Sequence, residues 1–119
     1  MISPKNVALT LLTALAPQAA FCGQPITQIV VWDSNFKLVT TISEKDSTKG
    51  LNELWKAKKV AKPASSPNWK YEIDVYASKE ASRWLYDPKG FAMKSTKSKS
   101  PIYSIPSPER FNRLLEVTP

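Results

Sequence analysis

The sequence contains no histidine, a single cysteine, Cys22, and only three glycines in 119 residues. Without an imidazole, this chain by itself cannot build a Ser-His-Asp triad, a Cys-His dyad or a histidine-ligated metal site. One cysteine excludes an intrachain disulfide and a zinc site of four cysteines. Gly23, Gly50 and Gly90 are too scattered to form a phosphate-binding loop, and no Asp-x-Asp-x-Asp calcium loop is present. The sequence therefore predicts no cofactor, no metal site and no catalytic residue.

The first 22 residues have the three-part composition of a secretory signal peptide. A short start carrying Lys5 precedes the uncharged apolar run 7–16, and small residues follow the helix breaker Pro17. The apolar run is too short to span a bilayer, which needs about 20 residues. We therefore predict that residues 1–22 are a cleaved signal peptide and that the protein is periplasmic or secreted.

Cleavage is expected after Cys22. Signal peptidase prefers small side chains one and three residues before the cut, and Ala20 and Cys22 then occupy these positions. The mature chain is predicted to be a single domain over residues 23–119.

Two alternatives for the leader stay open. Cys22 could carry a lipid anchor, although the bulky Phe21 before it departs from the small residue that lipoprotein signals prefer. Residues 7–16 could instead form a buried helix of a cytosolic protein that retains its N-terminus, although they show no clear polar face.

The remaining chain has the pattern of a small α+β domain. Residues 69–76 alternate strictly between apolar and polar side chains, which is typical of a strand with one exposed face. Residues 78–82 are expected to form a polar connection. Strands are predicted over 26–33, 36–42, 69–76, 83–86, 91–95 and 102–105, and helices over 47–59 and from 108 onward. This order, β-β-α-β-β-β-β-α, predicts an antiparallel sheet with two helices packed on one face.

Local signals predict where the helices begin and where one hairpin turns. Ser43 and Asp46 have the spacing of a helix capping box. The sequence Asp87–Gly90 has the residues of a type I turn. Ser107 followed by Pro108 is typical of a helix cap and a first helical residue.

The positive charge predicts a binding surface. Lysine and arginine total 17 against 10 acidic residues, a formal net charge of +7. Because the 87–90 turn and the 96–101 loop are expected to lie close together, a partner-binding surface is predicted that consists of Lys89, Lys97, Lys99, Phe91 and Tyr103. Such a surface suits a protein or an anionic polymer. Nucleic acid fits less well, because most of the cations are lysine and no nucleic-acid recognition motif is present.

One pair of carboxylates allows an enzymatic alternative. Glu72 and Asp74 lie two residues apart on the exposed face of the predicted strand, which places them about 7 Å apart. Two carboxylates are the minimum for cleaving a glycosidic bond. The simpler interpretation is a solvated strand face with Lys70 beside it.

These observations favour an exported, non-enzymatic binding domain of the inhibitor or immunity type. Two alternatives remain: a cytosolic nucleic-acid-binding protein that retains its N-terminus, and a small glycan-acting enzyme that uses Glu72 and Asp74.

Overall fold

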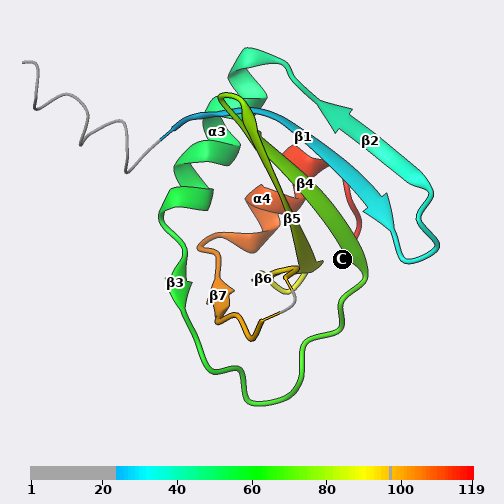
Figure 1. Ribbon diagram of the computed structural model, residues 1–119, viewed down its shortest axis with the longest axis vertical. Helices are drawn as coiled ribbons and strands as arrows, with labels where there is room; N and C mark the ends of the chain where they lie inside the picture. Colours follow the sequence, from blue (N-terminus) through cyan, green and yellow to red (C-terminus); the bar gives the residue numbers. More distant parts are fainter. Residues whose placement is uncertain (1–23, 97) are drawn as a thin grey trace, which may run out of the picture.

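A computed structural model describes residues 24–96 and 98–119 (Figure 1). The predicted signal peptide over 1–22 and its cleavage site lie outside the described residues, as does Lys97, so these stay predictions. The elements follow one another as β1 (Ile26–Asp33), β2 (Leu38–Ile42), α3 (Lys45–Lys56), β3 (Lys59–Val60), β4 (Tyr71–Ala77), β5 (Glu80–Asp87), β6 (Phe91–Lys94), β7 (Ile102–Ser104) and α4 (Pro108–Leu115).

The strands form one antiparallel sheet in the order β2-β1-β4-β5-β6-β7-β3. Helices α3 and α4 lie together against one face of this sheet (Figure 1). The predicted α+β fold is therefore confirmed. The helix predicted over 47–59 ends at Lys56 instead. The pattern also missed β3, because its two residues, Lys59 and Val60, become a strand only by pairing with β7.

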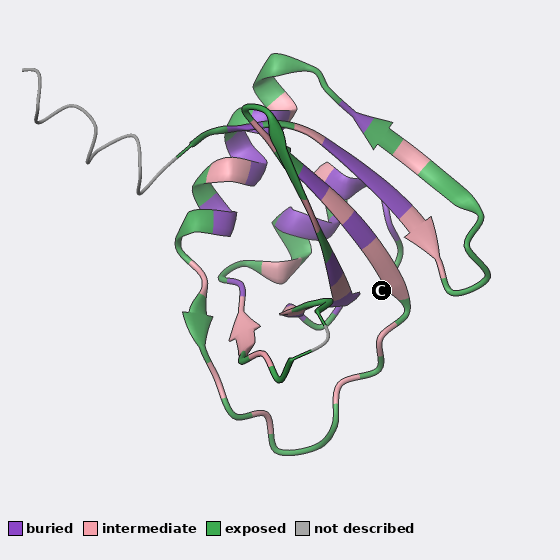
Figure 2. Ribbon diagram, in the orientation of Figure 1, coloured by how far each residue is buried: buried purple, intermediate pink, exposed green. Residues whose placement is uncertain are grey.

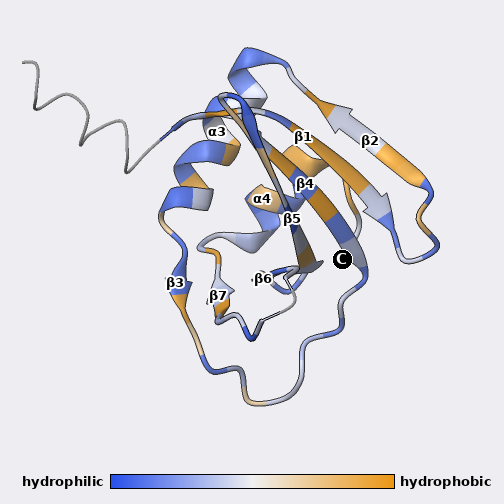
Figure 3. Cartoon of the chain, viewed as in Figure 1, coloured by the Kyte–Doolittle hydropathy of each residue, from blue (hydrophilic) through white to orange (hydrophobic). Residues whose placement is uncertain are grey.

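The core lies between the sheet and the two helices (Figures 2 and 3). The alternation predicted for β4 is confirmed at Ile73 and Val75, which are both buried on its inner face. Trp55 of α3 packs edge-to-face on Trp84 of β5, with ring centroids 4.7 Å apart, and stacks on Phe111 of α4 at 6.1 Å. Aromatic side chains from three elements thus join the sheet to both helices, and each can bury about 150–250 Å².

Two local predictions are wrong. Helix α3 has Glu44, not Ser43, at its N-cap position, and it has no side-chain cap hydrogen bond, so the capping box does not form. The polar connection over 78–82 is also wrong, because β5 already begins at Glu80 and only Ser78 and Lys79 form the turn. Pairing with β4 outweighs the weak strand propensity of these polar residues.

The turn and the second helix start are as predicted. The Gly90 amide donates to the Asp87 carbonyl at 2.8 Å and closes the turn. Gly90 has a φ of 106°, and an added Cβ would lie 2.9 Å from Cβ of Pro108, so glycine is required both by the backbone and by the close approach of α4. Pro108 is the first residue of α4, although Ser107 makes no side-chain cap bond.

Candidate functional site

The Asp87–Gly90 turn is held by a buried carboxylate. Asp87 is 3% exposed, and its two oxygens accept hydrogen bonds from the backbone amides of Asn68 at 2.8 Å and Lys89 at 2.9 Å. The first bond ties the long loop between β3 and β4 to the turn between β5 and β6. Asp87 thus fixes two surface segments relative to each other.

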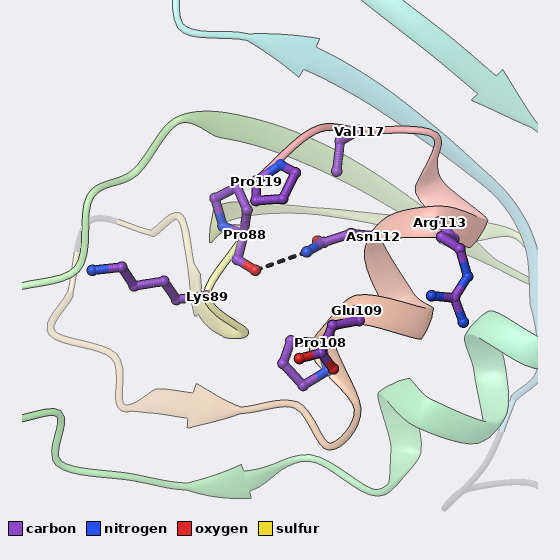
Figure 4. Close-up of a pocket in the computed structure, with 8 residues that line it drawn as sticks. All are labelled: Pro88, Lys89, Pro108, Glu109, Asn112, Arg113, Val117 and Pro119. Carbon is purple, nitrogen blue, oxygen red and sulfur yellow. Dashed lines mark hydrogen bonds between the residues drawn. The ribbon is translucent and has the colours of Figure 1, made fainter.

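A buried amide attaches α4 to the same turn. Oδ1 of Asn112 accepts a hydrogen bond from the hydroxyl of Tyr86, and Nδ2 donates to the Pro88 carbonyl at 2.8 Å (Figure 4). Asn112 is 6% exposed and Tyr86 is fully buried. Burial raises the pKa of Tyr86, and the nearby charge of Asp87 acts in the same direction, so its hydroxyl stays protonated and remains a donor.

A cavity of about 530 Å³, which we call the proline pocket, lies where the turn, α4 and the C-terminal residues meet (Figure 4). Its lining is partly apolar, from proline rings and a valine, and partly polar, from two cations, one carboxylate and the Asn112 amide. The lining residues are Pro88, Lys89, Pro108, Glu109, Asn112, Arg113, Val117 and Pro119. This volume lies in the range of ordinary ligand pockets.

A second, smaller hollow of about 260 Å³ lies beside it, and we call it the loop hollow. It is bounded by residues 63–68 of the long loop and by Asp87, Lys89 and Phe91. Lys89 is exposed and lines both cavities. Lys89 therefore borders both cavities, and its side chain extends from the turn away from the other residues that line the proline pocket (Figure 4).

The structure brings only some of the predicted surface residues together. Lys89 and Phe91 border the loop hollow, and Lys99 is exposed in the loop before β7. Tyr103 pairs with the buried Ala92, whereas Phe91 pairs with Ser104, so the side chains of Phe91 and Tyr103 lie on opposite faces of the sheet. Tyr103 packs against Trp84, with ring centroids 5.9 Å apart, and belongs to the edge of the core.

Lys58 occupies a site that the sequence did not indicate. Its Nζ lies 4.3 Å from the ring centroid of Trp55 and 5.2 Å from those of Trp84 and Tyr103, and it donates to the Trp55 carbonyl at 3.3 Å. Burial lowers the pKa of Lys58, while the three ring faces and the carbonyl favour the charged form. Its spacing of three residues from Trp55 was the available signal, although α3 ends at Lys56, before Lys58. This lysine therefore packs against the aromatic core, unlike its exposed neighbour Lys59.

The two carboxylates of the enzymatic alternative are both paired with a cation. Arg83 bonds both oxygens of Asp74, with its Nε at 2.7 Å, and lies 3.8 Å from Glu72. The indole of Trp32 donates to Asp74 at 3.0 Å. Neither carboxylate lines the proline pocket, the loop hollow, the cavity beside Trp55 and Val75 or the cavity along residues 61–67. This arrangement favours a structural role for both.

The Arg83–Asp74 pair predicts a pH dependence of stability. Hydrogen bonding from Arg83, with a smaller effect of Trp32, holds the pKa of Asp74 below its usual range. Because the pKa is lowered by folding, the stabilisation is present above the unfolded value, about 3.9, and is lost as the pH falls through the folded value. Urea unfolding of Asp74→Asn and the unsubstituted protein should show a constant difference above about pH 5 that shrinks below about pH 4. A difference that stays constant down to pH 2 would contradict this pairing.

Neither a metal-binding cluster nor a membrane-spanning helix is found within residues 24–96 and 98–119. This part of the chain holds no group of three or more cysteine, aspartate or glutamate side chains placed to bind a metal ion. It also holds no helix that is long and apolar enough to cross a membrane.

Comparison with known proteins finds no match of this chain to a protein-family model, to a curated protein or to a solved structure.

Proposed function

We propose that this protein is an exported, periplasmic or secreted, non-enzymatic binding domain of the inhibitor or immunity type. It binds a protein or an anionic polymer through the surface around the Asp87–Gly90 turn. The observation that carries the proposal is the position of Lys89, whose exposed side chain lies at the junction of two cavities on a turn fixed by buried hydrogen bonds.

A rigid site supports binding because little conformational entropy is lost when a partner docks. The carboxylate of Asp87 and the amide of Asn112 bond to the Lys89 amide and the Pro88 carbonyl, which together fix the peptide bond that precedes Lys89. The net charge of +7 adds attraction toward acidic partners and accelerates their association. Lys99 contributes further positive charge, and Phe91 contributes an apolar contact.

Crosslinking in the cell that makes the protein tests this role. A photoreactive amino acid placed at Lys89 is expected to capture one predominant partner. The matched control is Lys79, an exposed lysine in the turn at the opposite end of β5, where no such adduct should form. Equal adducts at both positions, or none at Lys89, would refute the proposed surface. Adducts with nucleic acid would favour the cytosolic alternative.

Export is tested separately by the N-terminal residue of the protein isolated from its own cell. A start at Gly23 is expected. A start at Met1 would refute the cleaved signal peptide, and a lipid-modified start at Cys22 would replace it with a membrane anchor.

A further inference from the structure

The proline pocket and the loop hollow meet at one side chain. Lys89 lines both, while proline rings supply much of the apolar wall on each side: Pro88 and Pro108 in the pocket, Pro63 and Pro67 in the hollow. A compact ligand would fill one cavity only. An extended ligand that crosses Lys89 could place one apolar group in each.

The positive charge of Lys89 favours a ligand that carries a negative charge between its two apolar groups. Lys89 borders both cavities, and Arg113 adds a second cation to the lining of the proline pocket, against the single carboxylate of Glu109. A carboxylate on the ligand beside Lys89 complements this charge, and pairing in a partly desolvated junction is stronger than pairing in open water.

The floor of the proline pocket offers a hydrogen-bond donor. Among the described residues, the side chain of Asn112 is bonded only to Tyr86 and Pro88, so one N–H of its amide has no protein partner. A buried polar group without a partner is costly. A backbone carbonyl of a peptide is a suitable acceptor for this N–H.

We infer that the two cavities bind an extended peptide segment of the partner protein, in which a carboxylate that pairs with Lys89 is flanked by two apolar side chains, one in each cavity. This inference rests on the proposed function and names the partner's recognition element. Rigid proline walls and a fixed turn suit an extended segment because the protein does not have to reorganise when the segment binds.

Titration of the isotope-labelled full chain with synthetic peptides tests the inference by NMR. The probes are acetylated, amidated nonapeptides of glycine and serine with one glutamate and a leucine two residues to either side. Amide shifts are expected in three segments, 63–68, 87–91 and 108–117. Replacing the peptide glutamate with glutamine should weaken binding about fivefold, the effect of losing one partly exposed ion pair.

The variant Lys89→Gln should cause the same loss, with no further loss when both changes are combined. The control Lys79→Gln changes charge equally at an exposed site away from both cavities and should bind like the unsubstituted protein. Both substitutions are of exposed lysines and leave the fold intact.

Four results would overturn the inference. These are no binding at millimolar peptide, equal binding of the glutamine peptide, equal losses for the two lysine variants, and identical shifts with hexanoate alone, which would indicate a small carboxylic acid instead. If a partner crosslinks at Lys89 while no peptide binds, the peptide inference fails and the binding role stands. If neither occurs, both fail.

Discussion

Replacing Asn112 with alanine is expected to lower the free energy of unfolding by about 3 kcal/mol. The change leaves the fully buried hydroxyl of Tyr86 without its acceptor and the Pro88 carbonyl without its donor. Each unsatisfied buried group costs about 1–3 kcal/mol, and the removed amide also leaves a small void. Urea unfolding monitored by tryptophan fluorescence measures this loss.

A double-mutant cycle with Tyr86→Phe separates the hydrogen bond from the void. Tyr86→Phe alone should cost about 1–2 kcal/mol, because it leaves Oδ1 of Asn112 unsatisfied. The double variant Tyr86→Phe/Asn112→Ala should be more stable than the sum of the single losses by about 1 kcal/mol. Additive losses would mean that the Tyr86–Asn112 bond contributes nothing to stability.

Replacing Asp87 with alanine is expected to lower the free energy of unfolding by about 2–3 kcal/mol. Two backbone amides, those of Asn68 and Lys89, lose a charged acceptor that is 3% exposed. The loop between β3 and β4 then loses its attachment to the turn, and hydrogen exchange of the Asn68 amide should increase together with the loss in stability.

Asp33→Ala is the matched control. The carboxylate of Asp33 also accepts two backbone amides, from Asn35 at 2.8 Å and Lys37 at 2.9 Å, but in the exposed hairpin between β1 and β2. Water can replace that acceptor, so its loss should cost less than about 1 kcal/mol. Equal effects of the two substitutions would show that burial of Asp87 adds nothing.

Asp87→Ala and Asp33→Ala are also expected to differ in their effect on partner binding. Asp87→Ala frees the backbone beside Lys89, so crosslinking at Lys89 should fall even under conditions where the variant is folded. Asp33 lies in a hairpin that lines neither cavity, and its substitution should leave crosslinking unchanged.

Sequence periodicity predicted the helices and strands that have one buried, apolar face. Alternation in β4 placed Ile73 and Val75 in the core, and helical spacing placed Leu51 and Trp55 on the inner face of α3. These predictions succeeded because the transfer of apolar side chains out of water dominates folding. The spacing of apolar residues along the sequence follows the period of the helix or strand that buries them. The ends of elements were less predictable, since residues 80–82, which were predicted to form a polar connection, joined β5 through pairing with β4.

The candidate site was predicted only in part for a related reason. The lysine and phenylalanine of the turn, Lys89 and Phe91, could be singled out by local composition, as could the turn itself. Tyr103 could not be assigned to the opposite face, because facing depends on the register of β6 and β7. Asn112 carried no local signal, since its partners are 24 and 26 residues away along the chain.

The amino-acid sequence by itself determined the absence of histidine chemistry and of an intrachain disulfide, the α+β fold class and the excess of positive charge. Each of these is a property of composition or of near neighbours. Only the tertiary structure decided that Asp87 and Asn112 are buried anchors, that Lys58 packs on three aromatic rings, and that Lys89 lines two cavities. The physical reason is that burial and hydrogen bonding between distant segments depend on how helices and strands pack, which no local pattern records.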